Sequence, residues 1–395
     1  MTTEFEHGGP TDEIRTVAYV GAGMMGCVNS LVAAVSGYHV VLHDASADML
    51  ASVVERQAAI GAYMVNIGYC TPDDLTAGLG RVTTASELAD AIVGADLVSE
   101  SIYEDREAKR SVFGQVDELA SPDTIITTNT SALMVSDLED AVESGTHFAA
   151  LHSHLGASLY DIVGGPRTST ETIDVLRRFV KTLGGTPMVL KKEHPGYVFN
   201  SMNGQVMLMA VQLVLDRSAT IEEVDRSWMT DRSAPMGPFG MMDLFGLDLM
   251  RDSWSAPTKD PHREALRGRV ESFLTELVEA GRLGQKSGSG FYTYPEPAYQ
   301  HPGFTDAEPP LETSSHALFG ALVAAAVMIE AKGVADRADI DMAWCAATGQ
   351  SIGPFGILAS VGVESFIAVI DELRVKRLIA VEAADLVRSH LRSTS

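Results

Sequence analysis

The first residues with chemical potential are glycines that directly follow a short apolar segment, residues 16–20 (TVAYV). The six residues after it are Gly21, Ala22, Gly23, Met24, Met25 and Gly26. This is the pattern G-x-G-x-x-G, in which Gly21 permits a tight turn and Gly23 lets the backbone approach a pyrophosphate. Gly26 lets the following helix pack closely on the strand. The start of that helix would offer N–H groups and a partial positive charge to phosphates.

An acid completes this pattern. The small, apolar segment 27–35 follows the glycines, a second apolar run covers 38–43, and Asp44 stands 23 residues after Gly21. A strand, a glycine turn, a helix, a strand and an acid in this order are typical of dinucleotide binding. Asp44 would accept hydrogen bonds from the adenosine ribose, and its charge would repel a 2′-phosphate. We therefore predict NAD as the cofactor.

Polar residues follow two later strand-like runs. Asn129, Thr130 and Ser131 follow the run 124–128, and His152 ends the run that begins at residue 147. The carboxyl ends of the strands form the ligand crevice of a doubly wound sheet. A histidine there can accept a hydroxyl proton near neutral pH, as the oxidation of an alcohol requires. Asp161, which we place beyond the strand end, would accept the other imidazole N–H and fix the tautomer.

These residues need a sheet to position them. Further strand-like runs at 81–84 and 95–98 alternate with helical patterns, and residues 46–80 are long enough for a helical insertion. Alternating strands and helices predict a Rossmann-type, doubly wound α/β domain with a mostly parallel sheet. From about Pro195 the strand signals stop, which predicts an all-α remainder.

The helical half contains an internal similarity at one offset of 116 residues. Residues 224–228 match 340–344, and the run GPFG at 237–240 recurs at 353–356. We predict three domains: an NAD-binding domain at 1–193 and two repeats of a helical unit at 194–295 and 315–395. The proline-rich stretch 295–310 would link the repeats. The repeats either pack as an internal pseudo-dimer in a monomer or are two independent domains, and a homodimer stays open.

Composition excludes several partners. The 395 residues are 46% hydrophobic, and 53 acidic against 29 basic residues give a net charge of −24, which argues against nucleic acid or an anionic membrane. The longest apolar run, 317–329, is short for a membrane span. Three scattered cysteines lack the spacing of a disulfide framework or a zinc site, so we predict no metal. The polar N-terminus does not resemble a signal peptide, and we expect a cytoplasmic protein.

At this point the sequence resembles the L-3-hydroxyacyl-CoA dehydrogenases over most of residues 14–295, and the second repeat resembles the duplicated C-terminal domain of the longer members. The segments that carry the resemblance are 20–26, 100–104, 128–131, 147–152, 168–169, 183–187, 195–200, 235–240 and 284–292. The resemblance implies hydride transfer between NAD and a 3-hydroxyacyl-CoA thioester.

The resemblance also implies roles for individual residues. His152 matches the catalytic base, and Asp161 falls near its carboxylate partner. Ser131 and Asn200 match substrate-contacting positions, although either side chain would also serve as a local cap or backbone partner. The positions on the cofactor side are Glu104, Lys109 and Asn129.

The departures from the family lie around the base. The family usually has His-Phe-Phe-Asn-Pro, whereas this chain has His-Ser-His-Leu-Gly from His152, and His154 could share the base role. The segment from base to carboxylate is about three residues shorter, the carboxylate is Asp instead of Glu, and Ser201 replaces an arginine. We infer an ordinary cofactor and an unusual substrate.

Three functions therefore stay open. The first is a dehydrogenase of 3-hydroxyacyl-CoA thioesters. The second is a family member that acts on a free 3-hydroxy acid, such as carnitine or a sugar acid like gulonate, or on a carrier-bound biosynthetic intermediate. The third is a catalytically inactive NAD-binding protein.

Overall fold

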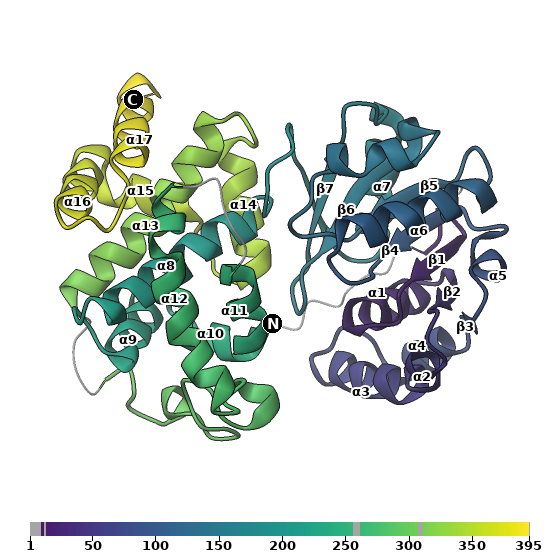
Figure 1. Ribbon diagram of the computed structural model, residues 1–395, viewed down its shortest axis with the longest axis horizontal. Coiled ribbons are helices and arrows are strands. Elements are labelled where there is room, and N and C mark those ends of the chain that lie inside the picture. Colours follow the sequence, from purple (N-terminus) through teal and green to yellow (C-terminus); the bar gives the residue numbers. More distant parts are fainter. Residues whose placement is uncertain (1–8, 12, 256–260, 307–310, 395) are drawn as a thin grey trace. The chain divides into compact units, whose positions relative to one another are not determined.

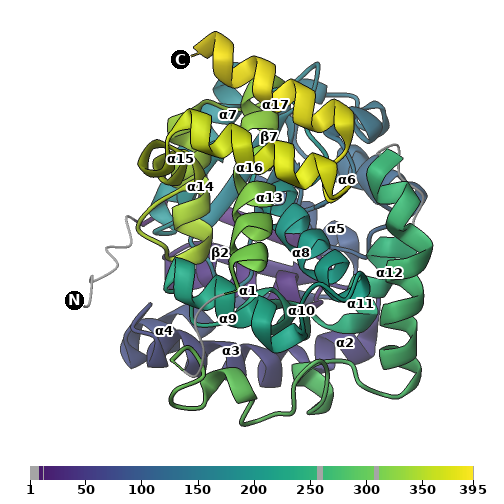
Figure 2. The same ribbon diagram turned by 90° about the vertical axis from the view of Figure 1, so that its left-hand side faces the viewer.

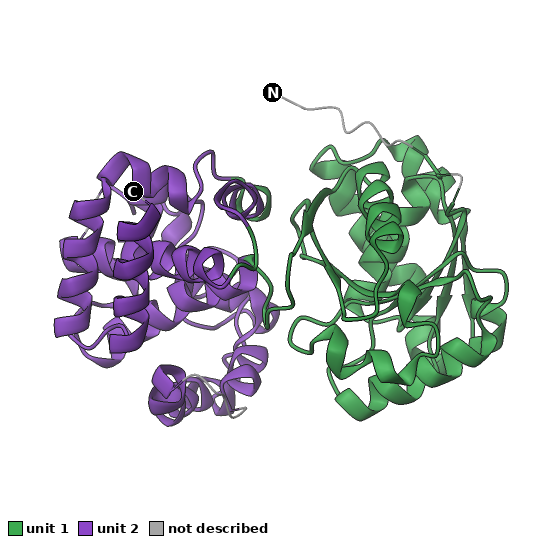
Figure 3. Cartoon of the chain, turned by 90° about the horizontal axis from the view of Figure 1, so that it is seen from above, with its two compact units in different colours: residues 1–198, 333–335, 346–349 green, residues 199–332, 336–345, 350–395 purple. Residues whose placement is uncertain are grey.

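The computed structural model describes residues 9–11, 13–255, 261–306 and 311–394. The chain forms two compact units (Figure 3). The first unit comprises residues 1–198 with 333–335 and 346–349, and the second comprises 199–332, 336–345 and 350–395. Both helical segments that we predicted as repeats therefore belong mainly to one unit.

The first unit is built on one eight-stranded sheet in the order β3-β2-β1-β4-β5-β6-β7-β8. Its strands are β1 (Thr16–Val20), β2 (His39–His43), β3 (Val82–Ala85), β4 (Leu97–Glu100), β5 (Ile125–Thr128), β6 (Phe148–Ser153), β7 (Leu159–Gly164) and β8 (Thr186–Val189). Strands β1 to β6 are parallel neighbours, which confirms the predicted doubly wound sheet. Strands β7 and β8, which the sequence analysis missed, run parallel to each other, and β7 pairs antiparallel with β6.

Helices connect these strands. They are α1 (Met24–Val35), α2 (Ala47–Ala51), α3 (Val53–Asn66), α4 (Pro72–Leu79), α5 (Leu88–Ile92), α6 (Arg106–Leu119) and α7 (Thr170–Thr182), with short 3₁₀ turns at Val135–Asp137, Glu139–Ala141 and Gly145–His147 (Figure 1). Helices α2 to α4 form the predicted helical insertion. Helix α6 begins after Asp105, whose carboxylate accepts a hydrogen bond from the backbone N–H of Ala108 at 2.8 Å.

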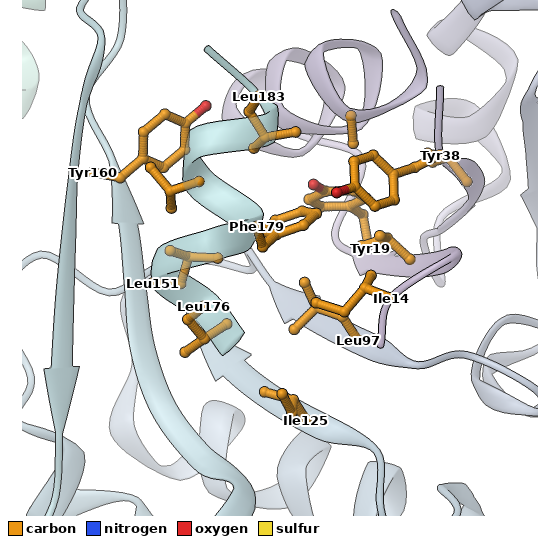
Figure 4. Packing of buried hydrophobic residues seen from close by; sticks show 14 of the residues in the cluster. Ile14, Tyr19, Tyr38, Leu97, Ile125, Leu151, Tyr160, Leu176, Phe179 and Leu183 are labelled. Atoms are coloured by element: carbon orange, nitrogen blue, oxygen red, sulfur yellow. The ribbon is translucent and has the colours of Figure 1, made fainter. Parts of the chain in front are cut away.

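One apolar cluster holds α1 and α7 to the sheet (Figure 4). The ring of Phe179 on α7 meets the ring of Tyr38 edge to face, with centroids 5.0 Å apart. Leu97 on β4 and Leu151 on β6 belong to the same cluster, so the core extends beneath the strands that end at the candidate site. This packing fixes the strand ends that carry its polar side chains.

The second unit is helical. Its helices are α8 (Phe199–Leu215), α9 (Ile221–Arg232), α10 (Pro238–Phe245), α11 (Leu247–Ser255), α12 (Pro261–Glu279), α13 (Glu312–Ala331), α14 (Arg337–Thr348), α15 (Pro354–Val361), α16 (Val363–Val375) and α17 (Val381–Thr394), with 3₁₀ turns at Gln285–Ser287 and Ala298–Gln300. Helix α13 lies beside α8 and also packs against α9, α15, α16 and α17 (Figure 2).

The apolar run 317–329 lies within α13, which is 20 residues long. The helix extends beyond the apolar run at both ends, and its length and composition alone would suit a membrane span. However, 67% of its most apolar window is buried inside the structure. Packing in the core of the second unit accounts for its composition. The bent pair of α15 and α16 passes the same test only if both helices are taken together.

The two segments related by the offset of 116 residues make matching contacts. The Asp225 carboxylate accepts backbone hydrogen bonds from Phe239 and Gly240 at the start of α10. The Asp341 carboxylate accepts the same pair of bonds from Phe355 and Gly356 at the start of α15. A duplication would produce this similarity, although the duplication itself stays a prediction. Part of the predicted linker, residues 307–310, lies outside the described residues.

Candidate active site

The glycine turn is shaped by close backbone contacts. Gly21 has a φ of +107°, and its N–H donates to the carbonyl of His43 at 2.8 Å. A Cβ at Gly21 would lie 2.7 Å from the carbonyl oxygen of Ser101, and a Cβ at Gly26 would collide with the carbonyl oxygen of Gly21. At Gly23, by contrast, a Cβ would meet no atom of the described residues within 4 Å. Gly21 and Gly26 therefore serve the fold, whereas Gly23 leaves room above the turn.

The start of α1 fits a cofactor pyrophosphate. Among the described residues no side chain caps this helix, and no acid lies in its first turn, which contains Met24 and Met25. The first N–H groups of a helix need external acceptors, and phosphate oxygens provide them. The open space at Gly23 lies at the N-cap of the same helix. The predicted pyrophosphate site therefore agrees with the geometry of the turn.

Asp44 lies directly after β2 and is fastened to the glycine turn. One carboxylate oxygen accepts the N–H of Ala22 and the other accepts the N–H of Ser46, both at 2.8 Å. The guanidinium of Arg56 donates to the carbonyl of Ala22 at 3.0 Å and also holds the turn. Since each carboxylate oxygen has a second lone pair, Asp44 can still accept from a ribose hydroxyl.

A buried charge network lies at the ends of β4 and β5. The Lys109 ammonium on α6 is 1% exposed and lies 2.6 Å from Glu100 and 3.3 Å from Glu104. Glu100 is fully buried and also accepts from the Thr128 hydroxyl at 2.8 Å. Burial raises the pKa of Glu100, although Lys109 and the hydrogen bonds oppose that rise. Lys109, a residue predicted to lie on the cofactor side, therefore forms ion pairs with two carboxylates of the protein itself.

Glu104 positions the loop that carries Ser131. One of its oxygens accepts from the hydroxyl of Thr130 and from the N–H groups of Ser131 and Ala132, at 3.2 and 3.1 Å for the last two. Ser131 itself is exposed. The following 3₁₀ turn is capped by Asp137, whose carboxylate accepts from Met134 at 3.3 Å. The alternative that Ser131 caps a following helix is therefore not what the structure shows.

Asn129 joins the end of β5 to β6. Its side-chain oxygen accepts the N–H of Ser153 at 2.9 Å, and the Ser153 hydroxyl donates to Asn29 on α1 at 2.8 Å. Ser153, in the strand that carries His152, thus bonds both the predicted cofactor-binding residue Asn129 and the glycine-turn helix. The contact of Asn129 with the cofactor stays a prediction.

The predicted base and its carboxylate are brought together. His152 in β6 pairs directly with Asp161 in β7, and the distance from Nδ1 of His152 to Oδ2 of Asp161 is 3.3 Å. Both residues are buried, with His152 at 7% and Asp161 at 0% exposure. Asp161 lies beyond the end of the strand that carries His152, as predicted, but the sequence analysis did not recognise that it belongs to a further strand, β7. The antiparallel register of the two strands is what sets the two side chains opposite each other.

His154 shares the same carboxylate. Its Nε2 lies 2.7 Å from Oδ2 of Asp161, and its ring meets the His152 ring edge to face at 4.5 Å. Burial lowers the pKa of His152, and the neighbouring His154 adds to this, while Asp161 opposes it. Burial alone would raise the pKa of Asp161, but its hydrogen bonds with both histidines outweigh burial and lower it. The site is therefore suited to a neutral imidazole beside an ionised carboxylate.

Tyr197 is a site residue that the sequence analysis did not single out. Its ring lies 5.1 Å from the His152 ring, and its hydroxyl donates to the carbonyl of Thr130 at 2.7 Å. Tyr197 is buried and has a φ of +52°, a strained conformation that occurs at functional sites. It thus links the base to the Ser131 loop. The run Pro195-Gly196-Tyr197 gave only a weak signal of this sharp bend.

Glu100 was also missed, for a different reason. Its signals were its place after the apolar run 95–98 and its position in the segment 100–104 that carries the family resemblance, but a charged residue is usually exposed. Asn200 belongs to the first turn of α8 and hence to the second unit. Its predicted contact with the substrate stays a prediction.

The doubly wound sheet, the open glycine turn and the histidine–carboxylate pair at the strand ends define an NAD-binding oxidoreductase domain. The family model described as 3-hydroxyacyl-CoA dehydrogenase, NAD binding domain, matches residues 16–194, and the C-terminal domain model of the same enzymes matches residues 196–294. The chain belongs to the 3-hydroxyacyl-CoA dehydrogenase family. The predictions of the family, the cofactor NAD and an oxidoreductase are confirmed.

Individual relatives agree with this assignment. The chain is 30% identical over 294 residues to the mitochondrial hydroxyacyl-coenzyme A dehydrogenase of Sus scrofa, covering 71% of this chain and 91% of the relative. A diketoreductase structure shares 29% identity and a TM-score of 0.66 over 71% of this chain and 99% of its own. The 3-hydroxybutyryl-CoA dehydrogenase of Escherichia coli K12 is 21% identical, covers 97% of this chain and 100% of its own, and has a TM-score of 0.79. This last similarity shows the fold over nearly the whole chain.

Proposed function

We propose that the chain interconverts an L-3-hydroxyacyl-CoA thioester and its 3-ketoacyl form, with His152 as the general base. The observation that carries this proposal is the buried pair of His152 and Asp161 at the crevice end of the sheet. The Sus scrofa relative is named as a hydroxyacyl-coenzyme A dehydrogenase, which supports the substrate class. Direction is set by the supply of substrate and cofactor.

The tautomer of His152 follows from its partner. When Nδ1 carries the proton and donates it to Asp161, Nε2 keeps a lone pair and can accept the proton of the substrate hydroxyl. When bound, NAD would supply the acceptor for the hydride that leaves the carbinol carbon of the substrate. The charge of Asp161 then stabilises the imidazolium until its proton is released. A positioned base of this kind contributes about 10² to 10⁴-fold to the rate.

Ser131 is proposed to orient the substrate. Its loop is held by Glu104 and by the hydrogen bond of Tyr197 to Thr130, so the backbone that carries its exposed side chain is anchored. A hydroxyl at this place can donate to the oxygen that becomes the ketone. Asn200 is proposed as a second substrate contact on the strength of the family resemblance alone.

A second candidate function is the oxidation or reduction of a non-CoA substrate, such as a free 3-hydroxy acid. Two observations favour it. His154 stands beside the base where the family usually has phenylalanine, and it changes the polarity of the base's surroundings. The diketoreductase that shares 29% identity is described as acting on dicarbonyl compounds.

The test measures NADH formation with 3-hydroxyacyl-CoA thioesters of increasing chain length and with the corresponding free acids. Turnover of the thioesters, lost by at least about 10²-fold in His152→Gln, is the expected result. Exclusive turnover of free acids would favour the second candidate. An inactive protein whose melting temperature still rises with NAD would support the third function, a catalytically inactive NAD-binding protein.

The proposal also includes a reducing, cytoplasmic location, because Cys27, Cys70 and Cys345 are free thiols in the described structure.

The quaternary state is proposed to be either a monomer with an internal pseudo-dimer or a homodimer. Sedimentation velocity at two protein concentrations would distinguish these states.

A further inference from the structure

The side chains of His152, His154 and Asp161 form a buried cluster beside the turn of the β6–β7 hairpin, which we call the His–His–Asp cluster. We propose that this cluster binds one zinc ion and that the ion reversibly inhibits the enzyme. The inhibitory part rests on the function proposed above. The sequence analysis expected no zinc site from the spacing of the cysteines, but this cluster contains no cysteine.

The donor atoms are of the right kind and at suitable distances. Two imidazole nitrogens and one carboxylate oxygen match the ligands of zinc sites that keep an open fourth position. The three donors lie within 4.8 Å of one another, with 2.7 Å from His154 and 3.3 Å from His152 to Oδ2 of Asp161. Zinc bonds of about 2.0 to 2.1 Å in a tetrahedral arrangement place ligand atoms roughly 3.3 Å apart. Small ring rotations are therefore sufficient to enclose an ion.

Asp161 gives an independent reason to expect a cation. It is fully buried, and within the described parts of the chain its Oδ1 has no hydrogen-bond partner. A buried oxygen without a partner costs about 1 to 3 kcal/mol, and more when the group is charged. Histidines bind metal in their neutral form, so a zinc ion would supply the positive charge that the carboxylate otherwise lacks.

The surroundings hold the donors in place. His152 and Asp161 are opposite residues of paired strands, and His154 follows β6 directly. The rings of His152 and His154 pack edge to face at 4.5 Å, and the Tyr197 ring lies 5.1 Å from His152. A site whose ligands are already packed loses little side-chain entropy when it binds an ion.

Zinc on Nδ1 of His152 would remove the base. The neutral ring keeps one proton, which must move from Nδ1 to Nε2 when the metal binds, so no proton is released. Nε2 then carries a proton and has no lone pair for the substrate hydroxyl. Zinc would also occupy Asp161, which otherwise stabilises the imidazolium. One bound ion therefore blocks proton transfer while leaving the glycine turn unchanged.

The experiment titrates the chelator-treated full-length protein with Co²⁺, whose visible absorption reports low-symmetry coordination by nitrogen and oxygen, and then displaces it with Zn²⁺. We expect one Co²⁺ per chain, displaced by one Zn²⁺. His154→Phe and His154→Gln should both lose the absorption. His39→Gln, at an exposed histidine on β2, is the matched control and should keep it. Circular dichroism tests whether each variant is folded. If both His154 variants fail to fold, the absorption of the Asp161→Asn variant decides whether the cluster binds the metal.

A lack of stoichiometric Co²⁺ absorption, or absorption that persists in the folded cluster variants, would overturn the zinc site. Activity is measured separately on the same chelator-treated protein. One equivalent of Zn²⁺ should lower turnover by at least about 10²-fold, the contribution of a general base. If zinc instead restores activity, the inhibitory role is wrong. If Co²⁺ binds as expected and no substrate is turned over without metal, the proposed function fails while the zinc site stands.

Discussion

The sharpest test of the active-site chemistry is the substitution Asp161→Asn. It removes a negative charge that lies 3.3 Å from Nδ1 of His152 and is fully buried. With an effective dielectric constant of about 20, Coulomb's law gives an attraction of about 5 kcal/mol at this distance. His154 shares the same oxygen, so only part of this attraction acts on the His152 imidazolium. We therefore expect its stabilisation to fall by about 3 to 5 kcal/mol. At 1.36 kcal/mol per decade this corresponds to a fall in kcat of about 10² to 10⁴-fold.

The assay is steady-state NADH formation in the presence of a chelator, so that bound metal does not contribute. KM for the substrate should change little, because Asp161 is inaccessible to it. Asp174→Asn is the control, since among the described residues Asp174 on α7 forms an exposed ion pair with Arg177 and no other, and exposed pairs contribute little. A fall of less than about tenfold in a variant with a native melting curve would refute the role assigned to Asp161.

Three further predictions follow from the same structure. The value of kcat/KM for oxidation should rise with pH, and the midpoint of this rise should lie below pH 6.5. The reason is that the base must be neutral and burial lowers the pKa of His152. A midpoint above pH 6.5 in chelator-treated enzyme would contradict this. Gly23→Ala should weaken NAD binding at an unchanged melting temperature, whereas Gly26→Ala should cost about 1 to 3 kcal/mol of stability, and calorimetry with and without NAD separates the two. Lys109→Met should cost about 3 to 5 kcal/mol at pH 7, because Glu100 stays buried without its cation. Burial raises the pKa of Glu100, so urea unfolding should show that this loss shrinks as the pH falls and the carboxyl takes up a proton; a pH-independent loss would argue against the buried charge.

Local patterns made much of the fold predictable. The glycine turn, the strands β1 to β6 and the insertion of α2 to α4 each rest on apolar runs, glycines and spacings within short segments. Strands β7 and β8 were not predicted, and the reasons are physical. Strand β7 has a buried acid, Asp161, in its middle, and β8 contains Pro187, a residue that strands usually avoid. Their partners are set by tertiary contacts that no local pattern expresses.

The site residues were predictable where the residue type and its position after a strand together indicate a chemical role. His152, Ser131 and Asp44 lie at strand ends as expected. The burial of Lys109 between Glu100 and Glu104 was not predictable, because charged residues are exposed by default and only the folded pair offsets desolvation.

The hairpin of β6 and β7 separates two kinds of change in this enzyme. The pairing of His152 with Asp161 is specified by strand register, whereas the tip at 155–158 turns around Gly156, with Leu155 exposed. Because register in a hairpin depends on the length of its loop, insertions or deletions at this tip would move the proton-transfer pair out of alignment, whereas substitution of the exposed Leu155 would leave the register unchanged. A library that varies the type of residue 155 but keeps the length of the tip therefore preserves the acid–base pair in every member.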